Sequence, residues 1–141
     1  MIKVNPRQTA EAFLKKAKAV NRKVNRALKV GAMELALEMK KSIHAHKSMG
    51  REYRRRSVTH TASMAGYPPN SDTGYLANSI TPTESVRNSS TYVIVGAKYA
   101  RALEFGARRR KLKPRPFVRP ARQKTGFKIY NRIKKAMNDA L

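Results

Sequence analysis

Apolar residues recur every three or four positions along the first third of the chain, with lysine, arginine, asparagine and glutamine between them. This is the period of an amphipathic α-helix. Asn5 and Pro6 form a typical helix start, because Asn caps the first turn and Pro fits its first position. The sequence therefore predicts a long helix over residues 6–47. Its apolar stripe comprises Ala10, Phe13, Ala17, Val20, Val24, Ala27, Gly31, Leu35, Met39 and Ile43.

The stripe changes character near its middle. Gly31 and a drift in the spacing predict a bend or break between Val30 and Ala32. The second half is richer in Leu and Met, and we expect it to pack on the chain's own sheet. Two interpretations remain open for the first half, which carries Phe13 and Val20. It either contacts a neighbouring subunit or packs in the chain's own core.

Residues 71–121 carry the shorter patterns of a small sheet with short helices. Asp72 or Thr73 is expected to cap a short helix. Residues 80–87 and 91–96 predict two strands of a hairpin, because the second run is rich in β-branched and aromatic residues. This region is therefore expected to form the sheet-bearing body of the protein.

The remaining segments complete the predicted architecture. Residues 99–105 predict a short helix ended by Gly106. Residues 48–70 are expected to be a basic loop, and residues 122–141 a C-terminal helix whose apolar side carries Phe127, Tyr130, Ile133 and Met137. The expected fold class is α+β, a long N-terminal helix and a C-terminal helix packed on a small antiparallel β-sheet, with extended basic loops. With 141 residues, we expect one domain, residues 1–141.

The charge balance of the chain is extreme, with 32 Lys and Arg residues against 8 Asp and Glu residues and a formal net charge of +24. Such an excess repels itself within a compact monomer and persists where a polyanion or an acidic protein surface compensates it. Nucleic acid, bound through its phosphates without sequence preference, is one such partner. The chain has no cysteine and no apolar run long enough to span a bilayer. We therefore expect a soluble protein made without export and no membrane partner.

Two segments concentrate the positive charge. In the first, four arginines, Arg51 and residues 54–56, flank Tyr53, an aromatic side chain that is able to stack on bases. The second follows Gly106, and three interpretations compete for it: a DNA-facing loop, a surface for an acidic protein partner, or a solvated run. The candidate DNA-facing or acidic-partner-facing residues are Arg54, Arg55, Arg56, Arg108, Arg109, Arg110 and Lys111.

Other residues are candidates for protein contacts. Prolines hold the segment after Lys113 extended and Phe117 gives it an apolar anchor, so we expect it to pair with a sheet edge in the same chain or the next. Glu104 lies among basic residues and is expected to form an ion pair with Arg101, Arg108 or a neighbouring subunit's arginine. The candidate subunit or partner contacts are Phe13, Val20, Tyr99, Glu104, Arg115 and Phe117.

The sequence contains little that indicates catalysis. Its central carboxylates form no pattern that separates an acid from a base, and glycine-rich phosphate loops are absent. His44, His46 and His60 lack the neighbouring ligands of a metal site, and solvated side chains are the favoured interpretation. We therefore expect no enzyme, cofactor or metal. A nuclease-like or regulatory enzyme would require a carboxylate cluster.

Four short motifs occur in order along the chain. They are Gly66 with Pro68-Pro69, Asp72-Thr73-Gly74-x-Leu76-x-x-Ser79-Ile80, Val95-Gly96 with Tyr99-Ala100-x-x-Leu103-Glu104-Phe105-Gly106, and Arg115-Pro116-Phe117-x-x-Pro120-Ala121. Through these motifs the chain resembles, over about residues 20–141, the tailed-phage family of neck, tail-completion and minor tail proteins of the lambdoid gene-10-like type. It departs from the family pattern at Ala107, where Thr is common, and in its heavier arginine run.

The resemblance implies a structural virion protein rather than an enzyme. It implies a subunit of a homo-oligomeric ring in the neck, made in the host cytoplasm. The ring would surround the channel for the double-stranded genomic DNA, between the portal or head-closure proteins and the tail-terminator proteins. Cyclic symmetry would require head-to-tail contacts between subunits. A freestanding basic nucleic-acid-binding protein, which would bind DNA or RNA as a monomer, is the alternative.

Overall fold

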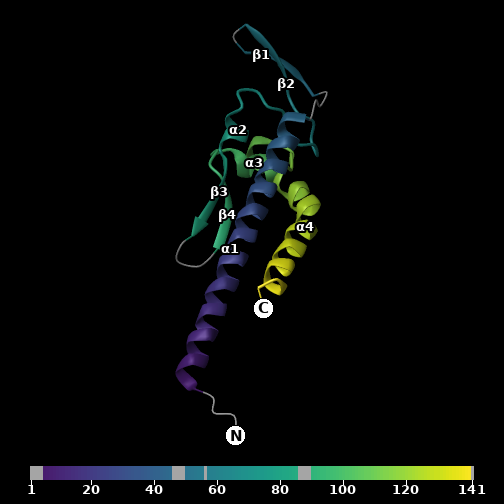
Figure 1. Cartoon of the computed structure of the whole chain (residues 1–141). Coiled ribbons are helices and arrows are strands. Elements are labelled where there is room, and N and C mark those ends of the chain that lie inside the picture. The colour runs from purple at the N-terminus through teal and green to yellow at the C-terminus, as the bar shows by residue number, and fades with distance from the viewer. Residues whose placement is uncertain (1–4, 46–49, 56, 86–89, 141) are drawn as a thin grey trace.

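The computed structural model describes residues 5–45, 50–55, 57–85 and 90–140, and the fold within them is α+β, as the sequence predicts (Figure 1). Both β-sheets are antiparallel hairpins. The helices are α1 (Pro6–Ala45), α2 (Tyr75–Asn78), α3 (Ala100–Phe105) and α4 (Val118–Asn138), with a 3-10 turn η1 (Arg108–Arg110), and the strands are β1 (Glu52–Arg55), β2 (Val58–Thr61), β3 (Ile80–Ser85) and β4 (Ser90–Val95).

Helix α1 forms the axis of the molecule, and at about 1.5 Å per residue it is about 60 Å long. Its start is confirmed, because the backbone N–H of Arg7 donates to Oδ1 of Asn5 at 3.1 Å. The predicted break between Val30 and Ala32 is wrong, since the helix is continuous from Pro6 to Ala45. Gly31 instead permits a close helix contact, because a Cβ atom there would lie 2.8 Å from Cγ2 of Ile129.

Helix α4 lies antiparallel to the second half of α1 (Figure 1). Lys124 pairs with Glu38 at 3.0 Å, whereas Lys128, one turn later in α4, pairs with Glu34 at 3.4 Å, one turn earlier in α1. The helix begins at Val118, not at residue 122. The prolines suggested an extended segment here, but Pro120 lies in the first turn, where the missing N–H costs no intrahelical bond.

The apolar side predicted for the C-terminal helix is wrong at three of its four residues, whereas the fourth, Ile133, is half-buried. Phe127, Tyr130 and Met137 are 76%, 60% and 47% exposed. The helix contacts α1 through another face, which carries the half-buried Ile129 and Arg132, and Arg132 pairs with Glu34. A charged residue thus takes an inward position that the apolar pattern did not indicate.

The β3–β4 hairpin lies beside α1, on the other side from α4 (Figure 1). Its register pairs Ile80 with Val95, and both residues belong to the core or pack against it. The largest fully buried side chains among the described residues are Phe117, Met39, Ile43 and Ile80, which come from the start of α4, from α1 and from β3. The second half of the α1 stripe therefore packs inside the chain, as the sequence predicts.

The β1–β2 hairpin lies beyond the C-terminal end of α1, in a region predicted to be a loop (Figure 1). Its register runs from Glu52 opposite Thr61 to Arg55 opposite Val58. All four residues of β1 are exposed. The strand therefore lacks the alternating apolar face by which strands are found in a sequence.

Candidate functional site

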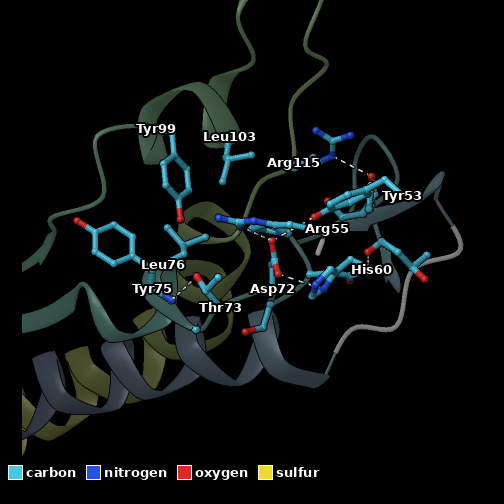
Figure 2. A pocket seen from close by; sticks show the side chains of 17 residues that line it. Tyr53, Arg55, His60, Asp72, Thr73, Tyr75, Leu76, Tyr99, Leu103 and Arg115 are labelled. Carbon is cyan, nitrogen blue, oxygen red and sulfur yellow. Dashed lines mark hydrogen bonds and ion pairs between the residues drawn. The ribbon is translucent and has the colours of Figure 1, made fainter. Parts of the chain in front are cut away.

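Asp72 connects the β1–β2 hairpin to the body of the protein (Figure 2). Its Oδ2 accepts a hydrogen bond from Nη1 of Arg55 at 3.0 Å, and its Oδ1 lies 3.1 Å from Nδ1 of His60. The hydroxyl of Tyr53 also approaches Oδ2, at 3.4 Å. Asp72 therefore does not cap α2, whereas the hydroxyl oxygen of Thr73, the alternative in the prediction, accepts a hydrogen bond from the backbone N–H of Tyr75 at 3.4 Å. The residue before α2 is Gly74, whose φ of 74° is a left-handed conformation that favours glycine.

The aromatic side of this cluster is formed by Tyr53 and His60, whose rings stack with centroids 5.7 Å apart. Burial, and then the charge and hydrogen bond of Asp72, raise the pKa of Tyr53 above its ordinary value. The Tyr53 phenol therefore keeps its proton to a higher pH than an ordinary tyrosine. Asp72, Arg55, His60 and Tyr53 are referred to below as the Asp72 cluster.

A cavity of about 360 Å³ lies between the Asp72 cluster, α2 and α3 (Figure 2). Tyr75 and Tyr99 belong to its lining, with ring centroids 6.4 Å apart. Burial has the largest effect on the pKa of Tyr99 and raises it, and the electrostatic effects of Tyr75 and Asp72 raise it further. Asp72 is the only carboxylate among the described residues that line the cavity, and both its oxygens already have partners. An acid–base pair of carboxylates is therefore absent from this described lining.

Glu104 has a role that the sequence did not indicate. Its Oε2 accepts hydrogen bonds from the backbone N–H groups of Phe117 at 2.8 Å and Val118 at 2.9 Å, and its Oε1 accepts one from Arg119 at 2.9 Å. The carboxylate thus caps the N-terminus of α4, where its negative charge also complements the helix dipole. The predicted ion pair with Arg101 or Arg108 does not occur within the part of the chain that the structure describes.

The arm that carries Arg115 and Phe117 is attached to its own chain. Phe117 has no exposed surface and lies in the core. The Arg115 backbone N–H donates to the carbonyl of Leu103 at 2.6 Å, and its Nε donates to the carbonyl of Ser63 at 2.9 Å. These bonds connect α3, the β1–β2 hairpin region and the start of α4. Phe117 was expected to contact a neighbouring subunit, but the structure buries it within its own chain.

The candidate basic residues have different environments. Arg55 is engaged by Asp72, whereas Arg54 is exposed, and Arg56 lies outside the described residues. Arg108 to Lys111 form a tight turn closed by the pairing of Ala107 with Leu112, rather than an extended arm. All four side chains of that turn are exposed, and none of them has an acidic partner among residues 5–45, 50–55, 57–85 and 90–140.

The first turns of α1 project beyond the rest of the molecule (Figure 1). Directly after the end of α4, the carbonyl of Asp139 accepts a hydrogen bond from Nζ of Lys23 in α1. Phe13 and Leu14 lie beyond this point and are 72% and 58% exposed, while Val20 is half-buried. The described fold therefore leaves Phe13 without an intramolecular core.

The histidine pattern does not produce a metal site in the described part of the chain. His60 contacts Asp72, His44 is exposed at the end of α1, and His46 lies outside the described residues. No group of three or more His, Cys, Asp or Glu side chains suited to a metal occurs among the described residues. Within the same residues, no helix is long and apolar enough to cross a membrane.

Comparison with known proteins identifies a family. A model of the family described as "Bacteriophage HK97-gp10, putative tail-component" matches residues 7–106. The matched region includes the first three of the four motifs and excludes the motif that begins at Arg115. No significant match was found among curated proteins or among solved structures. Because the matched residues make up more than half of the 141-residue sequence, the chain belongs to the HK97-gp10-like family of phage tail components.

Proposed function

We propose that this tail component is a structural protein of the neck, where it forms a homo-oligomeric ring around the DNA channel. In this proposal the ring joins the portal or head-closure proteins to the tail-terminator proteins, and genomic double-stranded DNA passes through its lumen without sequence-specific contacts. The observation that carries the proposal is the way in which the chain uses its few carboxylates.

Of the 8 acidic residues, five have carboxylates that form ion pairs or accept hydrogen bonds within the described chain. Glu34 and Glu38 pair with α4, Glu84 pairs with Lys29 at 2.8 Å, Asp72 holds the hairpin, and Glu104 caps α4. Only Glu11, Glu52 and the Asp139 side chain lack partners among the described residues. A second copy therefore offers few anions, which supports DNA or acidic neighbouring proteins as the source of the charge that compensates +24.

Apolar surface supports self-association. Phe13 and Leu14 are exposed on the projecting part of α1, and Phe127 and Tyr130 are exposed on α4. Among the described residues each β-sheet has two strands, so the outer edges of these strands have no further strand paired to them. A ring requires two different surfaces on each subunit, because cyclic contacts beyond a dimer are head-to-tail. The projecting helix is a suitable first surface, since it reaches beyond the subunit that carries it.

Electron microscopy tests this proposal directly. Purified protein, alone and mixed with portal and tail proteins of the same phage, is expected to form rings, and labelled particles are expected to carry the protein at the head–tail junction. The double substitution Phe13→Ser and Leu14→Ser should abolish rings while helical content is retained. Met33→Ser with Leu37→Ser, two residues about half exposed on the same helix, is the matched control. Particles that carry the protein only at the tail tip would refute the neck position.

A freestanding nucleic-acid-binding protein remains the second candidate. The β1–β2 hairpin favours it, since Tyr53 and the exposed Arg54 lie on a strand that projects from the body. This candidate predicts that the isolated monomer binds DNA or RNA with strong salt dependence and forms no ring. A monomer in sedimentation that binds duplex DNA, and no ring with any virion partner, would favour it over the neck proposal.

A further inference from the structure

A second cavity lies between α3 and the start of α4. It measures about 860 Å³, and its apolar part includes Val95, Ala100, Phe105 and Val118. Phe105 is 75% exposed, although it follows directly on the part of α3 that packs into the core. A large aromatic side chain exposed beside a hollow apolar surface is typical of an interaction site. This cavity is called the α3–α4 groove below.

The groove also carries three guanidinium groups. Arg101, Arg119 and Arg122 line it and are exposed, and none of them forms an ion pair within the described residues. Glu104 is the only carboxylate in the described lining, and both its oxygens accept hydrogen bonds from the α4 backbone. The groove therefore combines an apolar surface with an uncompensated positive charge.

The apolar surface and the positive charge together indicate which kind of molecule fits the α3–α4 groove. Duplex DNA would satisfy the arginines, but its phosphate backbone has no apolar group for the hollow beside Phe105. A second copy would supply apolar residues whose charged neighbours are mainly basic. Glu11 precedes Phe13 and Leu14, but Lys15, Lys16 and Lys18 follow them, and Lys128 follows Phe127. The arginines would repel those lysines. A segment with both apolar and acidic side chains satisfies both parts of the groove.

We propose that the α3–α4 groove binds an acidic, apolar segment of another virion protein. A large apolar side chain of that segment packs beside Phe105, and flanking carboxylates pair with Arg101, Arg119 and Arg122. Charged hydrogen bonds between arginine and carboxylate provide orientation as well as affinity. The identification of the partner as a virion protein rests on the neck proposal, whereas the chemistry of the segment rests on the groove.

The test uses the full chain and a fluorescein-labelled peptide of about 14 residues, with Leu and Phe at helical spacing and Glu between them. One comparison peptide replaces Glu with Lys, and another replaces Leu and Phe with Ser but keeps the charge. Fluorescence anisotropy in about 0.15 M NaCl measures the affinities. The first peptide is expected to bind at least about tenfold more tightly than either comparison peptide.

Variants locate the binding. Phe105→Ser and Arg122→Glu should each weaken the first peptide about tenfold, while Arg22→Glu, an equal charge change on the projecting part of α1, should change it less than about twofold. Phe105 and Arg122 are exposed, so circular dichroism should remain unchanged. Equal binding of the Ser peptide, insensitivity to both variants, or no binding would each overturn the proposal. Self-association that Phe105→Ser abolishes would instead identify a second copy as the occupant.

The outcomes separate this inference from the neck proposal. Rings at the neck without peptide binding would overturn the α3–α4 groove alone. Peptide binding that depends on Phe105, in a protein that forms no ring and is absent from the neck, would overturn the neck proposal. The groove would then remain a site for an acidic partner of another kind.

Discussion

Replacement of Glu104 by Ala tests how α3 is joined to the start of α4. The side chain lies on α3, and its two oxygens accept three backbone hydrogen bonds at 2.8 Å, 2.9 Å and 2.9 Å from the first residues of α4. Ala removes the acceptor from all three N–H groups at once. It also removes the negative charge at the positive end of the α4 dipole.

The expected cost follows from this geometry. A hydrogen bond to a charged group contributes about 1.5–3 kcal/mol net, and loss of an ordinary N-cap costs about 0.5–2 kcal/mol. Water can replace part of the loss at Arg119, which is exposed, but less easily at the fully buried Phe117. We therefore expect a loss of about 3 kcal/mol in the free energy of unfolding, which corresponds to a fall in Tm of about 10 °C.

Urea unfolding followed by far-UV circular dichroism measures this difference. Glu104→Gln keeps the shape and one acceptor oxygen, so it should lose about half as much as Glu104→Ala. Glu11→Ala removes the same charge from an exposed position and should change stability by less than about 0.5 kcal/mol. If Glu104→Ala were as mild as Glu11→Ala, the cap would not hold α4 and the reasoning would be wrong.

Three further predictions concern other contacts. Gly31→Ala should destabilise by about 1 kcal/mol, since crowding against Ile129 exceeds the gain in helix propensity, but it should stabilise in an Ile129→Ala background, as a double-mutant cycle in urea would show. Asp72→Asn should speed hydrogen exchange in the β1–β2 hairpin and leave α1 unchanged. It should also lower the pKa of Tyr53, measured as the difference in phenolate absorbance from Tyr53→Phe. In the unmodified protein the folded chain retains the Tyr53 proton above a pH of about 10, where the unfolded chain releases it. The contribution of Tyr53 to the free energy of unfolding should therefore be constant below that pH and fall above it. Arg108→Ala, Arg109→Ala and Arg110→Ala together should reduce the salt slope of duplex DNA binding by about 2–3 if this turn faces DNA, and the same change at Lys15, Lys16 and Lys18 should not.

Local patterns predicted the elements whose buried faces are apolar and regular. The second half of α1 was recognisable because Ala27, Gly31, Met39 and Ile43 repeat at helical spacing and are all buried. The hairpin of β3 and β4 was recognisable for a similar reason, since β-branched residues are concentrated in β4. In both cases the segment's own composition carries the signal.

The elements that the sequence predicted wrongly share a physical cause. Strand β1 is exposed along its whole length, so its pairing depends on Asp72 rather than on an apolar face. Helix α4 turns Phe127 and Tyr130 outward and packs Ile129 and Arg132 inward, because the Glu34 carboxylate opposite it pairs with Arg132 and Gly31 leaves room for Ile129. Which side of these elements faces the protein therefore depends on residues that are distant in the sequence.

By itself the sequence determined the α+β class, the long helix, the strong positive charge and the family of phage tail components, because these depend on composition, local spacing and short motifs. Only the tertiary structure decided what the motif residues do. In the structure Glu104 caps α4 instead of forming the expected ion pair, and Phe117 lies in the core. The arginines of the α3–α4 groove have no acidic partner among the described residues. A carboxylate binds whichever donors the fold brings within about 3 Å, and spacing along the chain does not reveal that choice.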